Sequence, residues 1–191
     1  SKLDRYVFQK VRSYISGRYE KGLEVVPVSM NLSWMDFYDE ALIDEIVDFL
    51  EHPEFPSELI RFEITETSYA ALEENVGKVL NKIKKKGAWI LLDDFGSGYS
   101  SFNMLQRFSF DILKIDMSFT REIEMNSRTR RLIPLIIETA HALDAKTVAE
   151  GAETKEQVEF LRNHGCDYIQ GYYFYRPLKK DEFSEKLDQN S

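Results

Sequence analysis

Short apolar runs alternate along the chain with segments whose apolar residues recur at helical spacing. Runs rich in apolar and β-branched residues predict six strands: Val25 to Leu32, Ile60 to Thr65, Trp89 to Asp93, Ile112 to Ile115, Thr147 to Glu150 and Tyr168 to Gln170. Helical patterns lie at Leu3 to Tyr19, Ala41 to Leu50, Ala71 to Lys86, Thr129 to Leu143, Thr154 to Asn163 and Phe183 to Leu187. This alternation predicts an α/β fold of parallel strands joined by crossover helices.

Polar residues stand at or near the end of every predicted strand. They are Asn31, Glu63, Asp93 with Asp94, Lys114 with Asp116, Glu150 and Gln170. A β/α barrel builds its active site at the carboxyl ends of successive strands, whereas an open sheet uses only the strands beside its switch point. The pattern therefore predicts a TIM-like (β/α)8 barrel. Because such a barrel needs eight strands, two are either too irregular to recognise or precede Ser1.

The composition narrows the class of protein. Of the 191 residues, 43% are hydrophobic, which is enough to fill a core and excludes a disordered chain. The net charge of −8 excludes a general nucleic acid binder, because affinity for phosphates comes mainly from clustered Lys and Arg. A single cysteine, Cys166, favours a reducing compartment, and no apolar run is long enough to cross a bilayer. We expect a soluble, cytoplasmic domain.

The converging polar residues form an oxygen-rich set without thiols. Glu63, Asp93, Asp94 and Glu150, with the amide oxygen of Asn31, offer the hard ligands that Mg²⁺ or Mn²⁺ prefers. Without a cation these carboxylates would repel one another, and two bound metals beside them would form a template for displacement at phosphorus. The alternative is that each acid caps a helix or pairs with a basic neighbour. That alternative suits one acid better than the whole set.

Lys114 allows two interpretations. A lysine on a barrel strand can form a Schiff base, as in aldolases. The strand period of two places Asp116 on the same face as Lys114, and a nearby carboxylate keeps an ammonium charged. A charged Lys114 would bind phosphate or orient water, so the sequence favours phosphate chemistry over an aldolase or lyase.

Six motifs resemble those of a known family. In chain order they are Val28-Ser29-Met30-Asn31-Leu32-Ser33, Phe62-Glu63-Ile64-Thr65-Glu66-Thr67, Asp93-Asp94-Phe95-Gly96-Ser97-Gly98-Tyr99-Ser100-Ser101, Leu113-Lys114-Ile115-Asp116, Ala149-Glu150-Gly151-Ala152-Glu153-Thr154 and Gln170-Gly171-Tyr172-Tyr173-Phe174. In this order and spacing they resemble the EAL-domain phosphodiesterases of bacterial cyclic di-GMP signalling. The resemblance implies a barrel enzyme that hydrolyses cyclic di-GMP to linear pGpG with Mg²⁺ or Mn²⁺, at a site for two metals.

The resemblance also implies roles for individual residues. The expected metal ligands are Asn31, Glu63, Asp93, Asp94 and Glu150, with Asp94 serving the second metal. Lys114 is expected to position water or phosphate, and Glu150 to act as the base on the attacking water. Glu66, Asp116, Glu153 and Gln170 are expected to support the substrate or a loop. That loop, Phe95 to Ser101, is similar to the family's lid and predicts a homodimer contact.

The front of the chain departs from the family pattern. Glu-Ala-Leu followed closely by Arg, which names the family, is absent, and the chain begins in a helical pattern without an initiator Met. We therefore expect residues 1–191 to be an N-terminally incomplete EAL domain, cut from a longer multidomain protein. The attached domains and any membrane anchor are left open. A degenerate domain that binds cyclic di-GMP without hydrolysing it is the alternative function.

Overall fold

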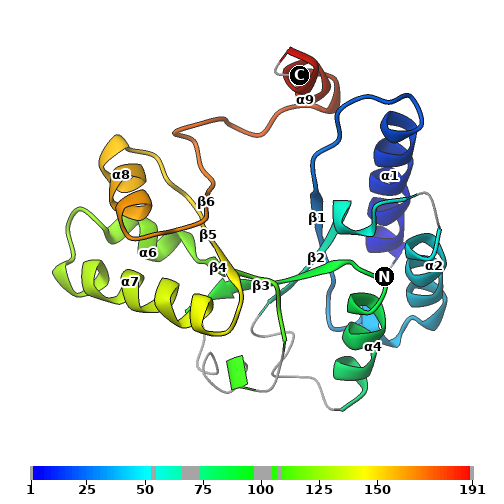
Figure 1. The fold of residues 1–191 in the computed structure, drawn as a ribbon, viewed down its shortest axis with the longest axis horizontal. Coiled ribbons are helices and arrows are strands. Elements are labelled where there is room, and N and C mark those ends of the chain that lie inside the picture. Colours follow the sequence, from blue (N-terminus) through cyan, green and yellow to red (C-terminus); the bar gives the residue numbers. More distant parts are fainter. Residues whose placement is uncertain (1, 53–54, 66–73, 97–104, 107–108, 190–191) are drawn as a thin grey trace. The chain divides into compact units, whose positions relative to one another are not determined.

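The computed structural model describes residues 2–52, 55–65, 74–96, 105–106 and 109–189 (Figure 1). The chain divides into two units. Unit 1 comprises Ser1–Ile64, Ala71–Ile90 and Leu178–Ser191, and unit 2 comprises Thr65–Ala70 and Leu91–Pro177.

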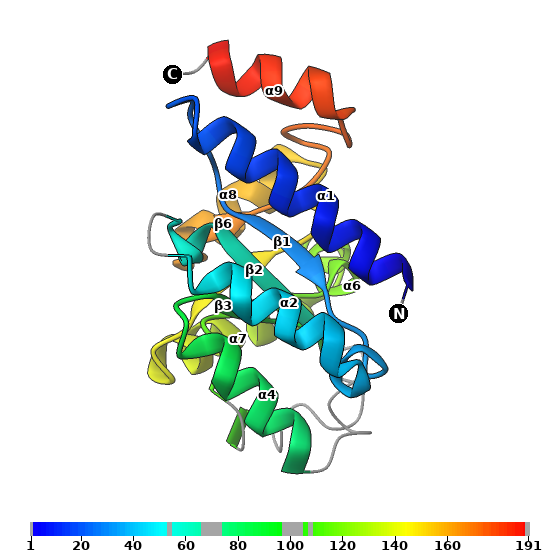
Figure 2. The same cartoon turned by 90° about the vertical axis from the view of Figure 1, so that its right-hand side faces the viewer.

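Unit 1 contains two parallel strands and the helices beside them. β1 (Val28–Asn31) pairs with β2 (Ile60–Thr65), and Asn31 lies opposite Glu63. Along one side of these strands lie α1 (Lys2–Tyr19), α2 (Glu40–Leu50) and α4 (Glu74–Lys84), as Figure 2 shows. Each helix buries large apolar side chains, and each fully buried side chain stabilises the fold by about 1.5–3 kcal/mol. This packing fixes the two strands that carry Asn31 and Glu63.

The last helix, α9 (Lys180–Gln189), contacts α1 mainly through polar groups. The Tyr14 hydroxyl lies 2.9 Å from Ser184 Oγ, and Arg18 Nη2 lies 2.5 Å from Asp188 Oδ1. Arg18 is itself buried, and it also donates to the backbone oxygen of Glu24. Because α9 has no buried residue, these contacts with α1 carry much of its attachment.

Unit 2 contains the remaining strands and helices. β3 (Trp89–Phe95) enters it at Leu91 and is followed by β4 (Ile112–Ile115), β5 (Lys146–Ala149) and β6 (Tyr168–Ile169), paired in parallel in that order. The described helices of this unit include α6 (Met117–Glu122), α7 (Ser127–Ala142) and α8 (Lys155–Asn163). α7 packs against β4 and β5, and all of β4 is buried. This packing fixes the positions of the carboxyl ends of β4 and β5.

The predicted α/β class is confirmed, and all six predicted strands occur, each parallel to its described neighbours. The first strand begins at Val28 rather than Val25, because Pro27 has no N–H for a strand ladder. Glu150 and Gln170 lie just beyond β5 and β6. Among the described residues, α6 and the 3₁₀ turns η1 (Asp36–Tyr38) and η2 (Ser57–Leu59) were not predicted.

No described helix is both long and apolar enough to cross a membrane.

Candidate metal and phosphate site

A bulge in β3 brings two successive carboxylates to one place. In a regular strand Asp93 and Asp94 would point to opposite faces. Here the pairing with β4 shifts register between Leu92 and Phe95, and Asp94 has a φ of 56°. This left-handed conformation is costly for a residue other than glycine, and such strain is concentrated at functional sites. The backbone N–H of Asp94 donates to Oδ1 of Asp93 at 3.0 Å, which helps to hold the bulge.

Lys114 lies between two of the acids. Its Nζ is 2.7 Å from Asp93 Oδ1 and 2.8 Å from Glu150 Oε1. The Lys114 side chain is only 7% exposed, so its charge is shielded from water and these ion pairs stabilise it. The strand period points Lys114 away from the packing of Leu113 and Ile115. Asp93 in β3, Lys114 in β4 and Glu150 directly after β5 therefore form a charged cluster.

Asp93, Asp94 and Glu150 together fit a hard divalent cation. One carboxylate oxygen from each lies within 4.8 Å of the others. Asp93 Oδ2 accepts no hydrogen bond from the described residues, so it remains available as a ligand. Carboxylate oxygens suit Mg²⁺ or Mn²⁺, and their shared negative charge exceeds the single positive charge of Lys114. A cation would offset that excess.

A cavity of ≈ 200 Å³ opens beside Glu150. Its other lining residues are Met117, Arg121, Gly151, Glu153, Gln170, Gly171 and Tyr172. Two of the predicted supporting residues, Glu153 and Gln170, are thus placed next to Glu150. Arg121 Nη2 lies 3.8 Å from Glu153 Oε1, so one basic group stands among the acids. The cavity therefore offers both hydrogen-bond donors and acceptors to a ligand.

Unit 1 holds the other two predicted ligands, Asn31 and Glu63. They stand opposite each other at the carboxyl ends of β1 and β2. Ser29 Oγ donates to Glu63 Oε1 at 2.5 Å and orients that carboxylate. Sequence reasoning missed this role of Ser29, although a hydroxyl two residues before Asn31 shares its face of the strand. Glu66 and most of the predicted lid, residues 97–101, lie outside the described residues.

Asp116 departs from its predicted place. The sequence predicts Asp116 beside Lys114 on one strand face, but β4 ends at Ile115. The Asp116 side chain instead accepts a hydrogen bond from the backbone N–H of Ser118 at 3.0 Å and caps α6. The carboxylates that accompany Lys114 are Asp93 and Glu150. An aspartate two residues before a serine was a usable capping signal, but α6 is too short to show a helical period.

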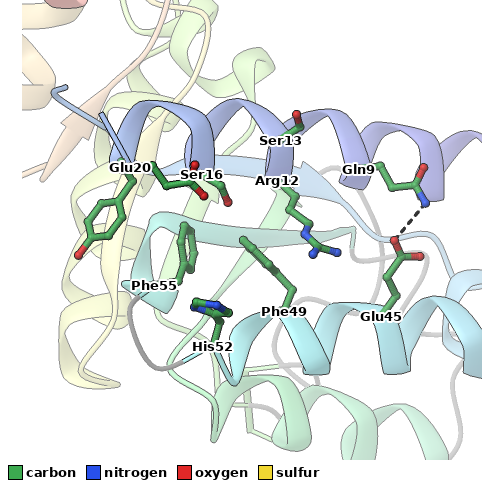
Figure 3. Close-up of a pocket in the computed structure, with 10 residues that line it drawn as sticks. Gln9, Arg12, Ser13, Ser16, Glu20, Glu45, Phe49, His52 and Phe55 are labelled. Atoms are coloured by element: carbon green, nitrogen blue, oxygen red, sulfur yellow. Dashed lines mark hydrogen bonds between the residues drawn. The ribbon is translucent and has the colours of Figure 1, made fainter. Parts of the chain in front are cut away.

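A larger cavity lies in unit 1 between α1 and α2, as Figure 3 shows. Its volume is ≈ 850 Å³, and it holds none of the residues that the sequence predicts for the site. Arg12 lies over the ring of Phe49, which packs against Phe55 with ring centroids 4.5 Å apart. Gln9 donates to Glu45 at one end. Size alone does not make this cavity the functional site, since its carboxylates are not clustered.

Comparison with known proteins gives a consistent family assignment. A family model described as the EAL domain matches residues 1–177. The cyclic di-GMP phosphodiesterase NbdA of Pseudomonas aeruginosa is 33% identical over 185 residues, which are 97% of this chain and 24% of that protein. The chain spans about a fifth to a third of the length of the first curated relatives it matches.

Solved structures agree with this assignment. The EAL domain of Mycobacterium smegmatis DcpA superposes with a TM-score of 0.89 at 26% identity, covering 98% of this chain and 84% of that one. Klebsiella pneumoniae BlrP1, solved in a manganese and cyclic di-GMP complex, gives a TM-score of 0.77 at 27% identity, covering 93% and 46%. The tripeptide Glu40-Ala41-Leu42 occurs here only in the first turn of α2 and is not followed by Arg. On the strength of the whole-length match, the chain belongs to the EAL domain family.

Proposed function

We propose that this chain carries the active site of a metal-dependent phosphodiesterase that hydrolyses cyclic di-GMP to linear pGpG in bacterial signalling. The observation that carries the proposal is the cluster of Asp93, Asp94 and Glu150 around Lys114. The family membership and the related structures solved in complex with cyclic di-GMP support this choice of substrate.

The proposed ligands for Mg²⁺ or Mn²⁺ are Asp93, Asp94 and Glu150 from unit 2, with Asn31 and Glu63 from unit 1, and Asp94 serves the second metal. All five offer oxygen, the donor that these cations prefer. Bound metal supplies positive charge that stabilises the phosphoryl oxygens during an in-line displacement. The manganese in the related BlrP1 structure supports this assignment.

Glu150 is the proposed base. Its carboxylate accepts a proton from the attacking water while the water oxygen forms a bond to phosphorus. The bond from phosphorus to the ribose 3′ oxygen breaks, this oxygen takes a proton from solvent water, and Glu150 returns its proton to solvent. Lys114 places a positive charge beside this carboxylate, with Nζ 2.8 Å from Glu150 Oε1. Lys114 is also proposed to position water or phosphate. Glu66, Asp116, Glu153 and Gln170 are proposed to support the substrate or the neighbouring loop, with Asp116 acting through α6.

Turnover by the native protein that contains this chain tests the function. We expect formation of pGpG from cyclic di-GMP with Mn²⁺, and loss of that product in Glu150→Gln. A folded, Mn²⁺-loaded protein that gives no pGpG would refute hydrolysis. Glu63→Gln tests the ligands of unit 1: we expect Mn²⁺ affinity to fall about 10- to 100-fold, while Glu58→Gln, an exposed control in the same unit, leaves it unchanged.

A receptor that binds cyclic di-GMP without hydrolysing it is the second candidate. The related PaMucR phosphodiesterase was solved in a complex with c-di-GMP, and binding of this ligand is the property that the two candidate functions share. Calorimetric binding of cyclic di-GMP together with no pGpG over hours would select the receptor. We also propose a homodimer contact through Phe95 to Ser101, which sedimentation of the protein with and without Gly98→Arg would test.

A further inference from the structure

We propose that α6 is a brace for the metal and phosphate site, in which Phe119 and Met117 are positioning residues for Asp94 and Glu150. The brace deepens the proposed function and rests on it for its consequence in catalysis. α6 follows β4 directly, so the helix begins three residues after Lys114. Phe119 contacts Gly96, directly after β3, and Met117 contacts Gly151, two residues after β5 ends. Asp94 and Glu150 lie beside these two glycines.

Phe119 packs directly on the backbone of Gly96. A Cβ atom placed on Gly96 would lie 2.5 Å from Phe119 Cε2, so the ring occupies the space that any other side chain would need. Gly96 has a φ of 95° and lies two residues after Asp94, whose φ is 56°. Two left-handed residues so close together need an external support to persist. The Phe119 ring is in contact with the second of them and thereby limits the movement of the bulge.

Met117 makes the equivalent contact with Gly151. A Cβ atom on Gly151 would lie 2.7 Å from the Cβ of Met117, and Gly151 has a φ of 72°. Gly151 is the residue after Glu150, so the Met117 contact bears on the backbone that orients this carboxylate. Met117, Glu150 and Gly151 line the same ≈ 200 Å³ cavity. Only glycine fits at position 151, because a side chain there would collide with Met117 and the positive φ disfavours other residues.

α6 is itself held firmly enough to act as a brace. Asp116 caps its first turn, and Thr120 within α6 and Ile123 directly after it are fully buried. α6 also packs against α7. A short helix anchored at its start and along its inner face moves as one body, so its contacts with Gly96 and Gly151 set the spacing of Asp94 and Glu150 together.

The brace predicts a selective effect of two substitutions in the 191-residue chain. Phe119→Ala should lower the hydrogen-exchange protection of the Asp94 amide about tenfold and leave that of Glu150 within about twofold. Met117→Ala should do the reverse, because the Glu150 amide, which donates to Ile115 oxygen at 3.1 Å, lies beside the Met117 contact. Met125→Ala, at a methionine that is 88% exposed, should change neither. Equal loss of protection at both amides, or no loss, would overturn the brace.

Metal affinity supplies the second measurement. We expect Phe119→Ala and Met117→Ala each to weaken Mn²⁺ binding, measured by calorimetry, by about tenfold, and Phe119→Leu to restore most of it. Affinity equal to the unsubstituted protein in both alanine variants would also overturn the brace. If the selective exchange pattern appears while the native protein makes no pGpG, the brace stands and the proposed hydrolysis fails.

Discussion

The Nζ atom of Lys114 lies 2.7 Å from Oδ1 of Asp93, although the two residues are 21 positions apart in the sequence. Their strands, β4 and β3, are neighbours in a parallel pair. Both side chains are largely buried, at 7% and 12% exposed. The contact places the positive charge of Lys114 among carboxylates, where it offsets their mutual repulsion when no metal cation is bound.

Removal of the Lys114 charge should destabilise the fold. We expect Lys114→Met to lower the free energy of unfolding by about 3–5 kcal/mol, because breaking a buried ion pair leaves uncompensated charge. Mn²⁺ should raise the melting temperature more in this variant than in the unsubstituted protein, since it replaces the lost positive charge. Lys155→Met, at a side chain that is 75% exposed, is the control and should cost little. An equal response to Mn²⁺ in both proteins would contradict the shared role.

The left-handed backbone of Asp94 should be a source of strain. Asp94→Gly should be more stable than Asp94→Ala by about 1 kcal/mol, because glycine adopts this φ without a steric penalty. Both variants should bind Mn²⁺ more weakly. Asp144, with a φ of 58°, is a matched control outside the cluster: Asp144→Gly should gain stability over Asp144→Ala without any change in Mn²⁺ affinity. Chemical denaturation and calorimetry measure the two quantities, and equal stability of the two Asp94 variants would argue against strain.

The cap formed by Asp116 should depend on its side-chain oxygen and not on its charge. Asp116→Ala should lose about 1 kcal/mol of stability, whereas Asp116→Asn should lose little, because asparagine caps helices about as well as aspartate. Turnover should follow the same order in the native protein. If Asp116→Asn lost as much activity as Asp116→Ala, a charged role beside Lys114 would replace the capping role.

Asp167 should make stability depend on pH in the acid range. Burial raises the pKa of this carboxyl, but hydrogen bonds from His141 and Thr147 outweigh it and hold the pKa of Asp167 below its ordinary value. A lowered folded-state pKa contributes stability that is present above the unfolded pKa and is lost as the pH falls through the folded pKa. The difference in unfolding free energy between the unsubstituted protein and Asp167→Asn should therefore shrink below about pH 4. A difference that stays constant to pH 2 would contradict the pairing.

Strands and long helices were predictable because burial imposes its pattern over several residues. Ile60–Thr65, which alternates between buried and half-buried residues, and Ile112–Ile115, which is buried throughout, are observed with the predicted bounds. α6 could not be predicted in this way. Its six residues make less than two turns, and the side chains that matter, Met117 and Phe119, contact backbone rather than a continuous core.

The sequence by itself determined the α/β class, the family and the set of acids, because hydrophobic period and ordered motifs are local properties of the chain. Tertiary structure alone decided how those acids meet. Asp93 and Asp94 lie close to Glu150 because the register of β3 shifts between Leu92 and Phe95. Lys114 pairs with Asp93 and Glu150, whereas Asp116 lies beyond the end of β4 and caps α6. Such choices depend on strand register and left-handed backbone, which arise from packing between segments that are distant in the sequence.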